Sequence, residues 1–339
     1  MTFMSLIKTK IYNFGNGGGS IMDGNQPKVY AVKHKNEKTR AVSRSGGVFT
    51  AISDWVLANK GVVYGCILSK DFEAVHIRAD HVDGRNRMRG SKYIPSRLGN
   101  TFRNVQADLF DGRRVLFTGT SCQIAGLKGF LKKDYDNLIC MDIICHGVPS
   151  PKVWFAYLEW QEKRYGAKVN DVDFRNKQDF GWHEHIETFS FDNGKKVSGE
   201  IFKNLFFGHM ILRPSCYVCP YKSIVHPGDI TIGDYWGIEK AAPEFDDNKG
   251  VSIVLINTNI GEYVFNAVKN KVMWKATRIE DSMQMALKEA VPKPSGREQF
   301  WNEYYAKNFG YIVRKYGGID VISKLKSRFR KIKRKLVEK

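Results

Sequence analysis

This sequence of 339 residues contains few of the features that mark membrane or secreted proteins. No apolar run reaches about 18 residues, so a transmembrane helix is not predicted. The first twenty residues hold no apolar core ahead of a small-residue cleavage site, so a secretory signal is not predicted either. No internal repeat is present. These absences favour a cytoplasmic protein, and the 42% hydrophobic and 26% charged residues are typical of a soluble globular chain.

Cysteine is scarce, with six residues and none before Cys66. In a long chain without a secretory signal, this count argues against a disulfide framework and favours cysteines that bind metal or react. Cys66 and Cys140 lie inside apolar strands, and we expect both in the core. The other four, Cys122, Cys145, Cys216 and Cys219, stand in motif-like surroundings.

Acidic residues are outnumbered, with 35 Asp and Glu against 54 Lys and Arg and a net charge of +19. A basic surface can attract nucleic acid, an anionic membrane or an anionic substrate. The signatures of RNA-binding sheets and of zinc fingers are missing, so no nucleic acid is expected as a partner.

The hydrophobic pattern predicts an α/β fold with a mixed sheet and flanking helices. Strands are predicted at 28–34, 61–68, 74–78, 114–117 and 138–144, and helices at 48–59, 123–131 and 152–164. Ser150 and Pro151 are suited to begin the last of these helices as cap and first residue. Beyond about residue 165 the pattern becomes less regular. Short strands are predicted at 172–174, 188–191, 229–232 and 252–257, with helix in the remainder.

The chain is accordingly divided into four parts: a flexible lead-in (1–27), a regular α/β region (28–165), a less regular region (166–310) and a basic helical tail (311–339). In the tail, Asp320 can cap a helix that has apolar residues every three or four positions along one face and Lys or Arg residues on the opposite face. Such a basic amphipathic helix suits an anionic membrane surface at the inner face of the membrane or an acidic partner. A docking helix with a solvated charged face is an equal alternative.

Three motifs carry the four cysteines. Gly119-Thr120-Ser121-Cys122-Gln123 places a cysteine where a strand runs into a helix, and the helix dipole there stabilises an anion. Cys122 is therefore a nucleophile, a metal ligand or a small residue at a tight turn. Cys145-His146-Gly147 follows the next strand end, which can bring Cys145 close to Cys122. Cys216 and Cys219 form a CxxC pair, so four thiols are available for a [4Fe–4S] cluster or a structural zinc.

Three further motifs combine glycine with polar or aromatic residues. Ser45-Gly46-Gly47 precedes a helix and can cradle a phosphate. Arg89-Gly90-Ser91-Lys92-Tyr93 places cations beside a glycine that a cofactor can approach. Gly233-Asp234-Tyr235-Trp236-Gly237 holds two aromatic residues suited to stacking on a flat ring. For each motif the alternative is a turn with packed aromatic residues.

Together, and in this order, the six motifs resemble the coenzyme F420 hydrogenase/dehydrogenase beta subunit family, over residues 29–257. The resemblance implies FAD and a [4Fe–4S] cluster, with electrons passing between the cluster and an organic hydride acceptor or donor. The implied cluster ligands are Cys122, Cys145, Cys216 and Cys219. The implied flavin-binding residues are Ser45, Gly46, Gly47, Ser91, Lys92, Tyr93, Gly119, Thr120, Asp234, Tyr235 and Trp236. By chemical analogy, Lys92 would stabilise the reduced flavin, and His146 is the second catalytic candidate.

Many relatives carry a ferredoxin-like segment with clustered CxxCxxC runs, whereas no cysteine precedes Cys66 here. The resemblance therefore implies that electrons arrive from a separate ferredoxin or another electron-transfer subunit. Some bacterial relatives are found with polysaccharide-synthesis enzymes. Two other functions remain open at this point: a transferase or hydrolase with Cys122 as nucleophile and His146 as its partner, and a zinc-stapled binding module at the membrane surface.

Overall fold

The computed structural model describes residues 26–319, so most of the predicted lead-in and the whole of the predicted amphipathic helix that begins at Asp320 lie outside the described residues. Within that range the chain forms a nine-stranded mixed sheet in the order β12-β1-β11-β10-β6-β5-β2-β3-β4 and a three-stranded sheet in the order β7-β8-β9. The large sheet contains β1 (Lys28–His34), β2 (Val62–Leu68), β3 (Ala74–Ala79), β4 (Ser96–Arg97), β5 (Val115–Thr120), β6 (Leu138–Ile143), β10 (Ile230–Asp234), β11 (Ser252–Ile256) and β12 (Val272–Thr277). The small sheet contains β7 (Val169–Asp173), β8 (Glu187–Phe191) and β9 (Lys196–Gly199).

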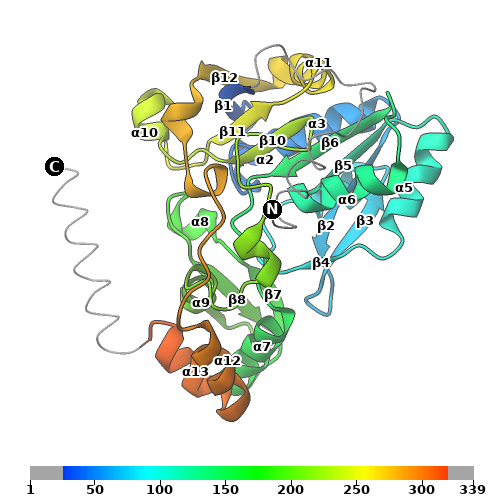
Figure 1. Ribbon diagram of the computed structural model, residues 1–339. Helices are drawn as coiled ribbons and strands as arrows, with labels where there is room; N and C mark the ends of the chain where they lie inside the picture. The colour runs from blue at the N-terminus through cyan, green and yellow to red at the C-terminus, as the bar shows by residue number, and fades with distance from the viewer. Residues whose placement is uncertain (1–25, 320–339) are drawn as a thin grey trace, which may run out of the picture.

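Helices connect and cover these strands (Figure 1). The α-helices are α2 (Glu37–Ala41), α3 (Val48–Ala58), α4 (Val82–Asn86), α5 (Thr101–Phe110), α6 (Ser121–Leu131), α7 (Pro151–Tyr165), α8 (Lys177–Phe180), α9 (Ile201–Phe207), α10 (Ile238–Ala241), α11 (Asn259–Val268), α12 (Arg297–Ala306) and α13 (Phe309–Tyr316). Short 3₁₀ helices are η1 (Pro214–Val218), η2 (Pro243–Phe245), η3 (Lys269–Lys271), η4 (Ile279–Ser282) and η5 (Met285–Leu287). Each helix in the described part of the chain is too short or too polar to cross a bilayer.

The centre of the large sheet is parallel. Strand β6 pairs in parallel with both β5 and β10, and β5 pairs in parallel with β2. Strand β11 runs antiparallel to both β10 and β1, so β1 points the same way as β10. The carboxyl ends of the five strands that point the same way, β1, β2, β5, β6 and β10, therefore meet at one side of the sheet, which we call the carboxyl edge. In open α/β sheets this is the side where ligands bind.

Alternating side chains divide the core of the large sheet into two layers. On β5, the side chain of Leu116 packs in the cluster formed with α3 and α11, whereas Val115 and Phe117 pack in the cluster formed with α5 and α6. All three side chains are fully buried. Helices thus cover both faces, which confirms the predicted α/β class with a mixed sheet and flanking helices.

The small sheet packs with α7, α9, α12 and α13 beside the large one (Figure 1). Its core is rich in aromatic residues, and Trp154 lies at its centre, where its ring contacts Phe174, Phe189 and Phe202. The indole Nε1 of Trp154 donates a 2.9 Å hydrogen bond to the carbonyl of Phe72, in the turn between β2 and β3. This bond and the surrounding apolar contacts join the small sheet to the carboxyl edge.

The strands and helices predicted by residue range agree with the structure within about three residues. Beyond the exceptions that follow, α2, α4, α8, α9, α10, β4 and β9 were also not predicted. Strand β12 lies in a region that we expected to be helical. Its four central side chains are all exposed, so it lacks the alternating pattern that marks a strand. Helix α5 was not predicted. Ser150 does stand at the N-cap of α7 with Pro151 behind it, but its side chain makes no capping hydrogen bond.

Candidate functional site

Two predicted cysteine motifs meet at the carboxyl edge. In the pairing of β5 with β6, Thr120 lies opposite Ile143, so α6 and the loop after β6 leave the sheet side by side. Cys122 in α6 and Cys145 in that loop each follow two residues beyond these paired positions. The sequence expectation that consecutive strand ends bring these two cysteines close together therefore agrees with the topology.

The CxxC pair joins them from η1. Burial raises the pKa of the Cys145 thiol to about 12, with the nearby Cys122 and Cys216 acting in the same direction and Lys222 opposing them. Cys219, whose pKa is also raised by burial, is influenced by Cys122 and Cys216. The four thiols, which we call the cysteine quartet, thus share one region. Within residues 26–319, however, no three His, Cys, Asp or Glu side chains lie close enough together to hold a metal ion.

Polar groups surround individual sulfur atoms of the quartet. The backbone N–H of Val148 lies 3.4 Å from Cys216 Sγ, toward which it donates, and Thr120 Oγ1 lies 3.1 Å from Cys122 Sγ. The Lys222 ammonium donates to the carbonyl oxygen of Cys145. N–H and hydroxyl donors of this kind favour the thiolate form of a cysteine, which is the form that binds a metal.

His146 is engaged away from Cys122. Its Nε2 lies 2.8 Å from Nε2 of His209, and its ring packs against Phe206 and Phe207. Burial lowers the pKa of His146 to about 4, and the nearby His209 and Lys222 contribute in the same direction. No hydrogen bond joins His146 to Cys122 in the described part of the chain. The structure therefore supplies no histidine base in contact with the Cys122 thiol.

Ser45, Gly46 and Gly47 lie where β1 and β11 reach the carboxyl edge. A Cβ at Gly46 would collide with the backbone of Val32 and Ser252, so only glycine fits there. The Gly46 N–H donates to Ser252 Oγ over 2.9 Å, and the Ser45 hydroxyl donates to the Val251 carbonyl over 2.7 Å. These donors serve the protein itself, so the predicted contact with a cofactor remains a prediction.

Lys92 and Tyr93 lie beside the same edge. The Lys92 ammonium donates to the carbonyls of Met88 and Arg89 over 2.9 and 2.8 Å, and burial lowers its pKa to about 8. Cys66, at the end of β2, is its electrostatic neighbour. The ring of Tyr93 packs against Phe174, His185 and Phe206, so this loop bridges the two sheets.

The three residues at the end of β10 have different surroundings. Asp234 accepts hydrogen bonds from Arg175 and from Trp182 Nε1, the latter over 2.8 Å. Tyr235 is completely buried in the apolar cluster behind the strand. Trp236 remains 37% exposed, and its ring stacks on Trp182 at 5.0 Å with an interplanar angle of 9°. Of these three predicted flavin-binding residues, only Trp236 presents its ring to the outside.

Sequence reasoning did not select Arg175 and Trp182, which donate to Asp234, or Arg44, which donates to the backbone carbonyls of Arg175 and Trp182. Arg175 and Trp182 belong to loops that combine polar and aromatic residues without distinctive spacing. Arg44 directly precedes the Ser45-Gly46-Gly47 motif, and this position is the one local signal that pointed to it. Their convergence depends on the small sheet folding against the large one, which no local pattern encodes.

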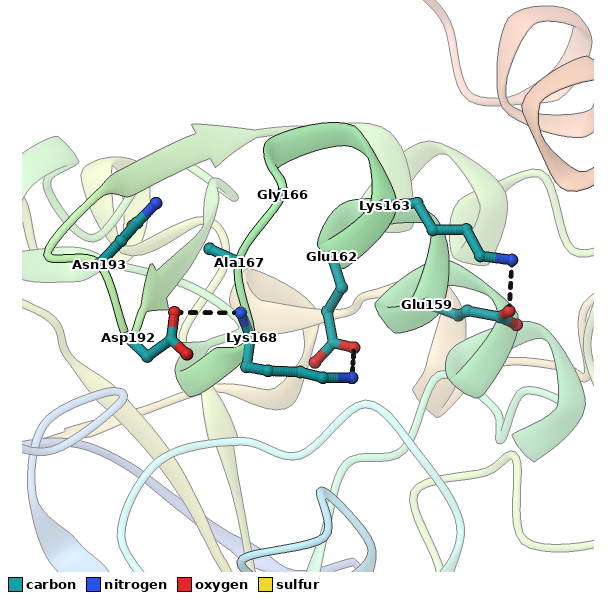
Figure 2. Close-up of a pocket in the computed structure, with 8 residues that line it drawn as sticks. All are labelled: Glu159, Glu162, Lys163, Gly166, Ala167, Lys168, Asp192 and Asn193. Carbon is teal, nitrogen blue, oxygen red and sulfur yellow. Dashed lines mark hydrogen bonds and ion pairs between the residues drawn. The ribbon is translucent and has the colours of Figure 1, made fainter.

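A separate hollow lies away from these residues (Figure 2). It measures about 490 Å³ and is formed by the end of α7 and the loops that flank β7 and β8. Surface ion pairs line it: Lys163 with Glu159 at 2.6 Å and Lys168 with Glu162 at 2.7 Å. None of the predicted site residues contributes to this hollow, so we do not assign it the function.

Comparison with known families identifies the chain. The family model for the C-terminal part of the coenzyme F420 hydrogenase/dehydrogenase beta subunit matches residues 112–282, half of the chain. The chain belongs to this family. The match includes the whole cysteine quartet and the end of β10, but not the motifs at 45–47 and 89–93. Membership in the F420 hydrogenase/dehydrogenase beta subunit family assigns the chain a role in redox chemistry and confirms the resemblance seen in the sequence.

A solved structure shows the same fold as this F420 hydrogenase/dehydrogenase beta subunit family member. A chain of the xenon-derivatised F420-reducing [NiFe] hydrogenase complex from Methanosarcina barkeri is 18% identical and superposes with a TM-score of 0.52. The likeness covers 88% of this chain and 97% of the other. At this identity the comparison supports the fold alone. No curated protein matches the sequence.

Proposed function

We propose that this chain is a flavin- and iron–sulfur-dependent oxidoreductase subunit. It would pass electrons between a ferredoxin-like partner and an organic hydride acceptor or donor. The observation that supports this most directly is the gathering of Cys122, Cys145, Cys216 and Cys219 at the carboxyl edge, beside the predicted flavin-binding residues. One edge of the sheet would then hold both redox groups.

The four thiols of the quartet are the donor type that an iron–sulfur cluster requires, although in the structure of residues 26–319 no three of them lie close enough together to hold a metal. Four thiols supply the soft ligands that a [4Fe–4S] cluster requires. Since burial raises the pKa of Cys145 to about 12, a metal is the group that would keep this residue as a thiolate. The Val148 N–H beside Cys216 Sγ would remain to adjust the reduction potential, as hydrogen bonds to cluster sulfur do.

The predicted flavin-binding residues come from four segments of the carboxyl edge. Ser45–Gly47 and Ser91–Tyr93 lie in loops before α3 and after α4, Gly119 and Thr120 end β5, and Asp234–Trp236 end and follow β10. Trp236, stacked on Trp182, would pack against the ring system. Lys92 would place positive charge near it. Bound FAD would supply the exchange between one-electron and two-electron transfer.

The organic partner remains to be assigned by experiment. The hydrogenase complex from Methanosarcina barkeri is F420-reducing, so we propose the deazaflavin coenzyme as the first candidate to test. A substrate in polysaccharide synthesis is the second, because some bacterial members of the family are found with polysaccharide-synthesis enzymes. Contact with a membrane surface through residues 320–339 remains a prediction.

The decisive experiment is the visible spectrum of the anaerobically purified protein, with iron, zinc and flavin measured on the same sample. Flavin together with about four irons per chain is the expected result. Zinc alone, or neither metal nor flavin after reconstitution, would contradict the proposal. Reduction of the bound flavin by a reduced ferredoxin, followed by transfer to F420, would then establish the direction of electron flow.

A further inference from the structure

A second cavity lies where the small sheet meets the carboxyl edge, away from the cysteine quartet. It measures about 80 Å³. Residues 41–44, the loop at Gly90 and Ser91, and residues 173–178 surround it. One water molecule needs roughly 10–15 Å³ of such space, so the cavity accommodates a group of a few heavy atoms but not a flavin ring.

Arg44 lines this cavity without a counterion. In the part of the chain that the structure describes, no carboxylate lies within 4.0 Å of its guanidinium. Two of its nitrogens donate to backbone carbonyls, Nη1 to Arg175 over 2.7 Å and Nη2 to Trp182 over 3.0 Å. Its Nε is buried and has no hydrogen-bond partner. A buried cation without a paired negative charge is unfavourable, and a bound anion would remove that cost.

The other charges around the cavity leave a partial excess of positive charge. Arg175 is paired with Asp234, and the Lys177 ammonium donates to the carbonyls of Arg40 and Lys249 over 2.6 and 2.9 Å. Asp173 is the one carboxylate among the lining residues. Asp173 and Asp234 supply two negative charges against Arg44 and Arg175, while burial and the neighbouring Arg44 and Arg40 lower the pKa of Lys177 to about 7, so Lys177 is only partly protonated at neutral pH. Burial and the neighbouring Arg175 lower the pKa of Arg44 only to about 10, so Arg44 remains charged at neutral pH.

Unused donors complete the lining. Neither Gly90 nor Ser91 forms a hydrogen bond to another residue within 26–319, through the backbone or through the Ser91 hydroxyl. An added Cβ at Gly90 would meet no atom within 4 Å, so the backbone there is open to a ligand. A guanidinium, a serine hydroxyl and glycine-loop amides are the groups with which proteins bind phosphate.

We propose that this cavity binds the phosphate group of an organic ligand, with Arg44 as its principal cationic contact and Ser91 as a second donor. A carboxylate is a weaker match, because its two oxygens use fewer of the available donors. The inference rests on the proposed function only for the identity of the ligand, which would be either the flavin, through its own diphosphate, or a phosphorylated substrate.

Calorimetric titration of the flavin-free full chain with inorganic pyrophosphate tests the site independently of any redox activity. We expect binding by the wild type, binding at least tenfold weaker in Arg44→Gln, and no change in Lys38→Gln. The last variant removes an equal charge from the exposed side of nearby α2. No binding by the wild type, or equal affinity in Arg44→Gln, would overturn the proposal.

Ser91→Ala provides a variant whose folding is not in question, since its hydroxyl has no partner to lose. Its affinity should fall about fivefold, as for one hydrogen bond worth about 1 kcal/mol. If Arg44→Gln unfolds, wild-type affinity in Ser91→Ala would count against the site.

Titration with FAD and with riboflavin then identifies the ligand. If the variants bind FAD more weakly than the wild type but bind riboflavin equally well, the site holds the diphosphate of the flavin. If the FAD-loaded wild type still binds pyrophosphate, the site holds the phosphate of a substrate.

Discussion

Trp182 Nε1 donates a 2.8 Å hydrogen bond to the carboxylate of Asp234, although 52 residues separate the two in the sequence. Arg175 donates to the same carboxylate and packs over the ring of Trp236, with its guanidinium 5.2 Å from the ring centroid. These contacts attach the segment after β7 to the end of β10. They hold the small sheet against the carboxyl edge, where the predicted redox groups would bind.

The Asp234→Asn variant tests this connection. It would leave Arg175 buried without its negative partner, and breaking a buried pair in this way costs about 3–5 kcal/mol of folding free energy. Urea unfolding followed by tryptophan fluorescence should show the loss. Glu159→Gln, which breaks an exposed pair with Lys163, should leave the unfolding midpoint unchanged. Equal midpoints for Asp234→Asn and the wild type would show that the pair does not stabilise the fold.

Substitution in the cysteine quartet tests the proposed cluster. Cys216→Ser should lose most of the bound iron together with the visible absorption of the cluster, because the three remaining thiols cannot supply the four ligands that the cluster requires. Cys140→Ala is the internal control, since Cys140 is buried in the core away from the carboxyl edge. Iron and sulfide should be assayed on folded protein of each variant. Full iron content in Cys216→Ser would remove Cys216 from the set of ligands.

Lys92→Met tests the proposed electrostatic role of Lys92. Removing a positive charge near the flavin should disfavour the more negative, reduced form and lower its potential. For a two-electron couple, about 30 mV corresponds to about 1.4 kcal/mol, and we expect a change of that order. Spectroelectrochemical titration measures it directly. As a control, Lys70→Met in the exposed turn before β3 should leave the flavin potential unchanged. An unchanged potential in Lys92→Met would show that Lys92 does not stabilise the reduced flavin.

Glu187 predicts a specific pH dependence of stability. Burial raises its pKa from 4.5 to about 7, while it accepts hydrogen bonds from the Phe202 N–H at 2.8 Å and the Tyr157 hydroxyl at 3.2 Å. The folded state therefore holds a proton that the unfolded state releases. The contribution of Glu187 to the free energy of unfolding therefore falls by roughly 3 kcal/mol as the pH rises from about 4.5 to about 7, and it is constant above that range.

The Glu187→Gln variant should remove this loss, because glutamine can accept the same hydrogen bonds without ionising. Urea unfolding of both proteins at pH 5 and pH 8 gives the comparison, and the variant should gain stability relative to the wild type at pH 8. Glu280→Gln, an exposed substitution, serves as the control. A stability difference between wild type and Glu187→Gln that is the same at both pH values would show that Glu187 does not ionise with a raised pKa.

Local sequence predicted the parts of the fold that local forces dictate. Strands β2, β5 and β6 and helices α3 and α7 have clear hydrophobic patterns, and all were predicted close to their observed bounds. Cys140 was expected in the core and is completely buried, whereas Cys66 is only partly buried beside Lys92. The pattern at β12 failed because that strand is stabilised by pairing with β1 rather than by burial of alternate side chains.

The sequence by itself determined the α/β class, the family and the motifs that carry the proposed redox site, because each is written in neighbouring residues. Only the tertiary structure decided which distant groups meet. Strand order brings the motifs of Cys122 and Cys145 together, and the packing of the small sheet brings Arg175 and Trp182 onto Asp234. The same packing leaves Arg44 at a cavity without a counterion. Such contacts join chain segments that are distant from one another in the sequence, and periodicity and spacing contain no information about them.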